Sequence, residues 1–200
     1  MLQVKKKGLL IVISSPSGAG KTTIAKKLTH KKKNIELSVS LTTRKPRKGE
    51  MDGVDYKFVS LEFFKKKIKQ KAFLEHAKVF GNFYGTLKEN IVKKINKGKS
   101  ILLDIDWQGA RQVRKKLAND TLSIFIVPPS LKELEKRLKK REGSLDFVKK
   151  RMSKAKQEIM HWHEYDCAVV NANLNDCLKK IKNILQIHNH IPRRQVISKY

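Results

Sequence analysis

Residues 9–23 read LLIVISSPSGAGKTT, an apolar run that passes directly into a loop rich in Ser and Gly. The run at residues 9–13 has the length and β-branched content of a buried strand, and a helical pattern follows the loop to about Lys32. Between them, residues 15–22 match the phosphate-binding motif GxxxxGKT, with Ser15 in place of the first Gly. Because a strand precedes the motif and a helix follows it, the sequence predicts a nucleoside triphosphate site.

The glycines, the lysine and the hydroxyl groups of this loop set its chemistry. Gly18 and Gly20 let backbone N–H groups turn inward at the start of the helix, where the helix dipole favours an anion. Lys21 is expected to reach the β- and γ-phosphates as a catalytic residue, and the Thr22 hydroxyl to bind Mg²⁺. The ATP-binding residues predicted from the loop are Ser15, Pro16, Ser17, Gly18, Ala19, Gly20, Lys21, Thr22 and Thr23.

The rest of the chain alternates strands and helices. Apolar runs at residues 100–105, 122–127 and 167–170 are typical of strands covered on both faces. We therefore predict a three-layer α/β/α fold of the P-loop class with a parallel core sheet.

Two segments interrupt this alternation. Residues 37–90 combine short strands, a basic turn-rich stretch and one helix, which predicts a mixed α+β insertion, a subdomain rather than a loop. Residues 130–164 begin with a capping box, Ser130 and Glu133, and continue as two amphipathic helices, a helical lid. The predicted core then comprises residues 1–36, 91–129 and 165–200.

The charge of the chain is its most unusual bulk property. Its 200 residues hold 46 Lys and Arg against 18 Asp and Glu, a formal net charge of +28. Such an excess suggests a nucleic-acid partner, but the lysines are spread along the whole chain and aromatic residues that would stack on bases are sparse. We interpret most of the excess as solvated surface and predict no specific nucleic-acid partner.

Other bulk features point to a soluble cytoplasmic protein. No apolar run approaches the ~20 residues that span a bilayer, and the basic N-terminus lacks a signal-peptide cleavage pattern, so no membrane partner is expected. Cys167 and Cys177 have no CxxC spacing and are expected to be reduced thiols. The sequence leaves the oligomeric state open, a homodimer included.

Three further segments carry a resemblance to a known family. Residues 38–56 read SVSLTTRKPRKGEMDGVDY, residues 73–86 read FLEHAKVFGNFYGT and residues 102–109 read LLDIDWQG. Together with the loop SSPSGAGKT, and in the same order over residues 9–173, they resemble guanylate kinase. The resemblance implies phosphoryl transfer from ATP to GMP, a transferase activity of purine nucleotide metabolism with Mg²⁺ as cofactor.

The acceptor phosphate has suitable ligands in the insertion. Arg44 and Arg47 offer forked donors for a phosphate dianion, and Tyr56 and Tyr84 offer phenolic hydroxyls. Ser40 adds a further hydroxyl. The resemblance assigns the two arginines and the two tyrosines to the GMP phosphate.

The base is expected to be selected by a carboxylate. Guanine presents N1–H and N2–H₂ side by side, two donors that one carboxylate accepts together, whereas adenine has an acceptor at N1. The resemblance assigns this role to Glu75, with Thr86 and Asp106 completing the guanine contacts. The family commonly has Ser at position 86, so Thr86 keeps the hydroxyl and adds a methyl group.

Asp104 and Asp106 lie at the end of a predicted strand, where open α/β sheets place ligand groups. Asp104 occupies the position of a Walker-B carboxylate and is expected to bind Mg²⁺ through water, alongside Thr22. For Asp106 an alternative is open, since an Asp at a strand end often caps the next helix.

The lid offers arginines for the transition state. Phosphoryl transfer spreads negative charge over the migrating group, and guanidinium groups that arrive on closure stabilise it. The resemblance implies this role for Arg137, Arg141 and Arg151, and it puts Asn171 near the adenine. The acceptor phosphate is already an oxyanion, so no general base is needed.

Two other hypotheses compete with the enzyme. A non-catalytic guanylate-kinase-like binding module generally has a degraded phosphate loop, whereas this chain keeps Lys21 and Thr22. A P-loop protein that depends on nucleic acid is suggested by the charge alone. His161 and His163 point to different faces of a helix and predict no metal site.

Overall fold

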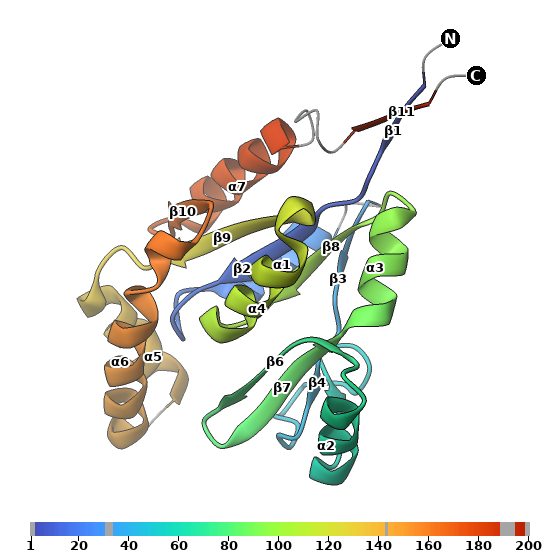
Figure 1. Cartoon of the computed structure of the whole chain (residues 1–200). Coiled ribbons are helices and arrows are strands. Elements are labelled where there is room, and N and C mark those ends of the chain that lie inside the picture. The colour runs from blue at the N-terminus through green and yellow to red at the C-terminus, as the bar shows by residue number, and fades with distance from the viewer. Residues whose placement is uncertain (1–2, 31–33, 143, 189–194, 199–200) are drawn as a thin grey trace.

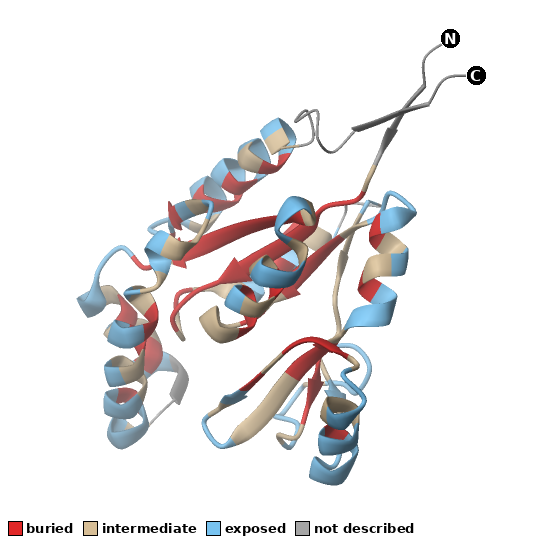
Figure 2. Cartoon of the chain, viewed as in Figure 1, coloured by how far each residue is buried: buried red, intermediate tan, exposed pale blue. Residues whose placement is uncertain are grey.

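Five parallel strands form the centre of the computed structural model, which describes residues 3–30, 34–142, 144–188 and 195–198. Across the sheet the strand order is β10-β9-β2-β8-β3, with β2 in the middle (Figure 1). These strands are β2 (Leu10–Ser14), β3 (Ile35–Leu37), β8 (Ser100–Asp104), β9 (Thr121–Val127) and β10 (Cys167–Val170). Every residue of β2 is buried, as the continuous apolar run predicts (Figure 2).

Helices cover both faces of this sheet. On one face, Ile11 and Ile13 of β2 pack in a cluster with α1 (Lys21–Thr29) and α7 (Leu174–His188). On the other face, Leu10 and Val12 pack in a cluster with α3 (Lys88–Asn96) and α4 (Trp107–Leu117). The predicted three-layer α/β/α fold with a parallel core sheet is confirmed.

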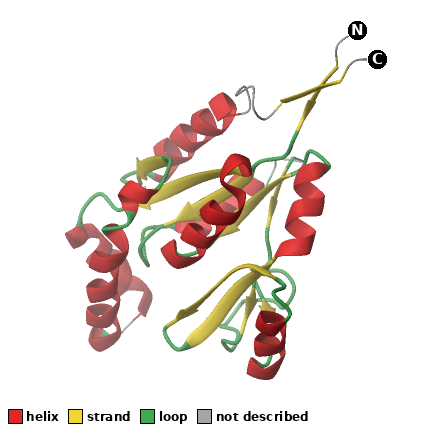
Figure 3. Cartoon of the chain, in the orientation of Figure 1, coloured by secondary structure: helices red, strands yellow, loops and turns green. Residues whose placement is uncertain are grey.

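A second, four-stranded sheet lies beyond the core and mixes parallel and antiparallel pairs in the order β5-β4-β7-β6. Its helix α2 (Leu61–Lys69) begins at the cap Ser60 and packs through Phe64, whose ring stacks on Phe73 at 4.5 Å. Its strands are β4 (Leu41–Thr42), β5 (Lys57–Phe58), β6 (Phe73–Val79) and β7 (Asn82–Leu87). The mixed α+β insertion is thus present (Figure 3).

The two lid helices, α5 (Leu131–Glu142) and α6 (Leu145–Ile159), pack against each other and against the phosphate loop. The hydroxyl of Ser130 accepts a hydrogen bond from the N–H of Glu133 at 3.0 Å, as the capping box predicts. Leu134 and Leu138 surround Ala19 of the phosphate loop in one buried cluster. The lid therefore touches the core at the loop where phosphates are expected.

Some elements differ from the expectations. The termini pair as antiparallel strands β1 (Gln3–Lys6) and β11 (Gln195–Ser198), where the sequence predicted only a basic tail. Helix α1 ends at Thr29 rather than near Lys32, which lies outside the described residues. Short 3₁₀ turns at Ala118–Asp120 and Trp162–Glu164 complete the chain. Over the residues described, no helix is long and apolar enough to cross a membrane.

Candidate active site

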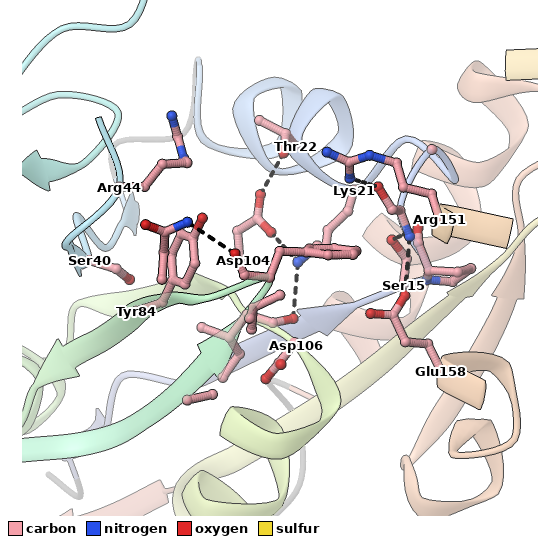
Figure 4. A pocket seen from close by; sticks show the side chains of 18 of the residues that line it. Ser15, Lys21, Thr22, Ser40, Arg44, Tyr84, Asp104, Asp106, Arg151 and Glu158 are labelled. Atoms are coloured by element: carbon pink, nitrogen blue, oxygen red, sulfur yellow. Dashed lines mark hydrogen bonds and ion pairs between the residues drawn. The ribbon is translucent and has the colours of Figure 1, made fainter. Parts of the chain in front are cut away.

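A cleft of about 550 Å³ lies where the phosphate loop, the end of β8, the second sheet and the lid meet. Most of the predicted site residues line it (Figure 4). They are Ser15, Pro16, Ser17, Gly18, Gly20, Lys21, Thr22, Thr23, Ser40, Arg44, Arg47, Tyr56, Glu75, Tyr84, Asp104, Asp106, Arg137 and Arg151. Ala19, Thr86 and Asn171 are buried behind the lining, and the side chain of Arg141 lies outside the described part of the structure.

The phosphate loop adopts backbone conformations that favour glycine. Gly18 and Gly20 have φ values of 91° and 97°, in the left-handed region, and Gly20 caps α1. A side chain at Gly20 would also meet the amide nitrogen of Asn171, 2.6 Å from an ideal Cβ. Asn171 in turn donates this amide to the carbonyl of Ala19 at 2.8 Å, so it braces the loop from behind.

Lys21, Thr22 and Asp104 form one polar cluster at the start of α1. Lys21 Nζ lies 2.6 Å from one oxygen of Asp104 and donates to the carbonyl of Ile105 at 3.0 Å. The Thr22 hydroxyl donates to the other oxygen of Asp104 at 2.9 Å. Burial alone would lower the pKa of Lys21, but the Asp104 carboxylate outweighs this effect and raises that pKa above its ordinary value.

The donor set of this cluster fits a magnesium ion. A hydroxyl from α1 and a carboxylate from the end of β8 lie within 2.9 Å of each other, and hard oxygen ligands are those that Mg²⁺ prefers. Among the described residues no group of three or more His, Cys, Asp or Glu could hold a metal by itself. Any metal here would therefore take much of its coordination from a bound nucleotide or water.

Glu75 is buried in the opposite end of the cleft, on β6. Its side chain accepts a hydrogen bond from the Thr86 hydroxyl at 2.6 Å, and Thr86 lies 3.0 Å from the hydroxyl of Ser40. The residue is 2% exposed, and this burial raises the pKa of Glu75 to about 7. Any side chain at position 109 would displace the Glu75 carboxylate, because an ideal Cβ on Gly109 would lie 2.5 Å from it.

Asp106 caps α4 and also lines the cleft. One of its oxygens accepts the N–H of Gly109 at 2.9 Å, which is the alternative that the sequence left open. Its other oxygen accepts from the side chain of Gln108 at 3.1 Å. The cap fixes the carboxylate beside Glu75 without removing it from the cleft.

Arg44 is held in place by an acid and by aromatic rings. One of its terminal nitrogens donates to both oxygens of Glu50 at 2.9 Å, and its guanidinium lies 5.5 Å from the centre of the Tyr56 ring. In the described structure its buried Nε has no hydrogen-bond partner. Tyr84 meets Tyr56 edge to face at 5.9 Å, so both phenols border the same space. Arg47 is exposed and lines the margin of the cleft. Its neighbours Lys45 and Lys48 are also exposed, but they do not line the cleft.

The lid places two arginines over the phosphate loop. Arg137 pairs with Glu133 at 3.0 Å and donates both terminal nitrogens to the carbonyl of Asn171 at 3.3 Å. Arg151 donates to the hydroxyl of Ser17 at 2.7 Å. Four lysines of the same two helices, Lys139, Lys140, Lys149 and Lys150, are exposed.

The sequence interpretation missed six of the residues that line the cleft, and two of these, Glu158 and Phe80, are charged or contact charged side chains. Glu158 of α6 is buried among the lining residues, three positions after the buried Ala155, so an acid on the apolar helix face was the available signal. Phe80, at the turn between β6 and β7, lies under two cationic side chains of α6: Lys154 at 4.2 Å and Arg151 at 5.1 Å from the ring centre. No sequence signal connected this turn with the lid, because they are far apart in the chain.

Comparison with known proteins gives one consistent result. The family model described as Guanylate kinase matches residues 7–188. The guanylate kinase of Zymomonas mobilis is 46% identical over 97% of this chain and 90% of that protein, and that of Hydrogenovibrio crunogenus is 50% identical over 88% and 86%. The crystal structure of guanylate kinase from Anaplasma phagocytophilum superposes with a TM-score of 0.81, at 38% identity, over 96% of this chain and 92% of that one. The resemblance seen in the sequence is confirmed.

Proposed function

The chain belongs to the guanylate kinase family, and on this premise we propose that it transfers the γ-phosphoryl group of ATP to GMP with the help of Mg²⁺. The observation that carries the proposal is one cleft with a phosphate loop at one end and a buried carboxylate, Glu75, at the other. A nucleoside triphosphate on the phosphate loop and a nucleoside monophosphate at Glu75 would place their phosphates next to each other in this cleft. The reaction is that of a nucleoside monophosphate kinase, a transferase, in purine nucleotide metabolism.

ATP binds through the phosphate loop. The N–H groups of the loop and the N-terminus of α1 receive the β-phosphate, and Lys21 leaves Asp104 to follow the β- and γ-phosphates. We assign Asn171 two contributions: it braces Ala19 from behind and borders the adenine side of the site. Thr23, the residue after the motif, completes the donor contacts.

Thr22 and Asp104 are the residues that would hold Mg²⁺, Asp104 through water. When bound, the ion neutralises charge that develops on the β- and γ-phosphate oxygens. The hydrogen bond between these two side chains keeps both oxygens directed into the cleft.

GMP binds at the second sheet. Glu75 accepts the N1–H and N2–H₂ groups of guanine, while Thr86 and Asp106 complete the contacts to the base. Adenine would leave this buried carboxylate facing an acceptor, an arrangement that costs several kcal/mol in comparable sites. Ser40, Arg44, Arg47, Tyr56 and Tyr84, which line this part of the cleft, hold the phosphate.

The lid supplies charge to the transition state. Arg137, Arg141 and Arg151 stabilise the migrating phosphoryl group and exclude water, while an already ionised GMP oxygen attacks without a general base. We propose that residues 130–164 move as the lid and residues 37–90 as the GMP-binding unit, relative to a core of residues 1–36, 91–129 and 165–200. We place the enzyme in the cytoplasm, where both nucleotides are present.

One coupled assay tests the proposal. The chain is supplied with ATP, Mg²⁺ and one of GMP, AMP, UMP or CMP, with and without added nucleic acid. ADP formation that requires GMP supports the proposed reaction. No turnover with any acceptor would favour a non-catalytic binding module. ATP hydrolysis stimulated by nucleic acid would favour a P-loop protein that depends on nucleic acid.

A further inference from the structure

Glu158 is a buried acid without an assigned role. Only two acidic residues are buried in the described structure, Glu75 at 2% exposure and Glu158 at 8%, and both line the cleft. Glu75 has a ligand to recognise, as argued above. A carboxylate that lines a phosphate site at the other end of the cleft needs a different explanation, because it would repel the incoming phosphates.

The contacts of Glu158 exclude a simple structural ion pair. Its carboxylate accepts a hydrogen bond from the backbone N–H of Ser17 at 3.3 Å, and none of the described cations lies within 4.0 Å of it. The nearest candidates are engaged elsewhere: Lys154 lies over Phe80, and Lys21 is paired with Asp104. Burial raises the pKa of Glu158, so its position has an energetic cost that no partner fully offsets.

Ser17 carries the polar contacts between the lid helix α6 and the phosphate loop. Arg151 of α6 donates to its hydroxyl at 2.7 Å, and Glu158 of α6 accepts its backbone N–H (Figure 4). The two residues are seven positions apart, about two helical turns, so they share one face of α6. Val148 and Ala155 of the same helix pack in a buried cluster with Ala19 of the loop, and the two polar contacts to Ser17 add to this packing in fixing the orientation of α6.

We propose that Glu158 is a positioning residue of the phosphoryl-transfer reaction: it docks α6 on the N–H of Ser17 and thereby holds Arg151 over the phosphates. The inference rests on the proposed function, because it assigns Arg151 to the transition state. Glu158 itself touches no reacting atom.

Kinetic comparison of variants tests this role. We expect Glu158→Ala to lower kcat about tenfold or more, because it removes a hydrogen bond to a charged group, with KM for GMP within about twofold. Glu158→Gln keeps an acceptor oxygen and should lie between Glu158→Ala and the unchanged chain. In an Arg151→Ala background, Glu158→Ala should add less than about a threefold further loss, because both residues act through the same docking. Glu135→Gln changes a half-buried acid of α5 that pairs with Lys139 outside the cleft; it is the control and should keep normal kcat.

Three kinetic outcomes would overturn the proposal. These are an unchanged kcat in Glu158→Ala, a full additional loss in the Arg151→Ala background, and a lower KM for ATP at unchanged kcat. The last would show that Glu158 merely competes with the donor phosphates. If Glu158→Ala does not fold, Glu158→Gln carries the same tests.

A measurement on the unliganded chain separates this inference from the proposed function. Amide hydrogen exchange at Ser17, followed by ¹⁵N NMR, should be slow in the unchanged chain and about tenfold faster or more in the Glu158 variants. Equal exchange rates would refute the docking contact. A chain that shows no GMP phosphorylation would refute the proposed function, and the exchange result would still decide whether Glu158 docks the lid.

Discussion

Glu75 is an acidic residue that is buried without a cation beside it, an arrangement that disfavours its ionised form. Its carboxyl group is almost completely buried, and the polar contacts that the structure gives it include the hydroxyl of Thr86 but no cation. Its burial raises its pKa to about 7, so at neutral pH about half of the unliganded molecules carry a proton there. Such a site is unfavourable when empty and favourable when guanine supplies two donors, which is how a buried acid becomes a selective contact.

Replacing the carboxylate by an amide should remove base selectivity. We expect Glu75→Gln to lower kcat/KM for GMP by about two to three orders of magnitude, since the amide offers one acceptor and one unwanted donor to guanine. KM for ATP should stay within about twofold. Steady-state kinetics with each substrate varied in turn provides the measurement, and unchanged kcat/KM for GMP would contradict the role of Glu75.

The affinity for GMP should fall as the pH is lowered through 7. Only the ionised carboxyl of Glu75 accepts both guanine donors, so binding below its pKa of about 7 first requires loss of a proton. Between pH 8 and pH 6 the Kd should rise about tenfold. Calorimetry with guanosine is the control, because it lacks the phosphate that itself titrates near pH 6. A Kd for guanosine that does not change over this range would contradict the prediction.

The same group should make stability depend on pH. Its pKa is raised from 4.5 in the reference state to about 7 in the fold, so the folded chain binds more protons than the unfolded chain between these values. Stability is therefore lost as pH rises through this window, by about 3 kcal/mol at most. We expect Glu75→Gln to melt above the unchanged chain at pH 8, with a smaller difference at pH 5. Thermal unfolding of both chains at pH 8 and at pH 5 is the measurement. A difference in melting temperature that is the same at both pH values would contradict the prediction.

At the scale of elements, helix α4 links the core to the second sheet. Strand β6 is an edge of that sheet, and the side chain of Gln112 pairs with both the N–H and the carbonyl of His76, at 3.2 and 2.7 Å. Lys116 donates to the carbonyl of Leu74 at 2.5 Å. Both contacts flank Glu75. Helix α4 therefore provides hydrogen-bond partners for backbone groups on the free edge of β6, the strand that carries Glu75.

The sequence predicted those elements whose signals are local. The strand and helix around the phosphate loop and the cap at Ser130 each follow from a few neighbouring residues. By contrast, the hydrogen bond from Asn171 to Ala19 joins residues 152 positions apart, and nothing in either residue type indicates which partner it contacts. The pairing of β1 with β11 was missed for the same reason, because two strands of four residues at opposite ends of the chain stabilise each other only once the core has brought them together.

The turn at Phe80 should contribute to lid closure. Its ring lies beneath Lys154 and Arg151, contacts worth about 0.5–2 kcal/mol each in proteins. We expect Phe80→Ala to lower kcat about threefold to tenfold while the chain still folds, since the residue is 42% exposed. Phe63→Ala is a matched control, because Phe63 is similarly exposed and lies under Lys67 on α2, away from the cleft. An equal effect of both variants on kcat would contradict a specific contact.

At the scale of the whole molecule, the question is what a net charge of +28 does for a small-molecule kinase. A few cations face the cleft, among them Lys21, Arg44 and Arg137. Many others, such as Lys65, Lys66 and Lys69 of α2, are exposed and line no part of it. Composition alone suggested a nucleic-acid surface, and only the order of the motifs along the chain pointed to two nucleotides instead.

The charge should act on the rate at which anionic substrates arrive. Long-range attraction is screened over about 10 Å at 0.1 M salt, so the association rate of GMP should fall about tenfold between ~20 mM and ~300 mM salt. Neutral guanosine should associate at nearly the same rate throughout, which separates steering from any effect of salt on the fold. Replacing Lys65, Lys66 and Lys69 by Gln should weaken the salt dependence for GMP while kcat at saturation stays unchanged, because these side chains lie outside the cleft. Stopped-flow measurement of both ligands decides the matter: equal salt dependence for guanosine and GMP would mean that the excess of lysine has no part in substrate capture.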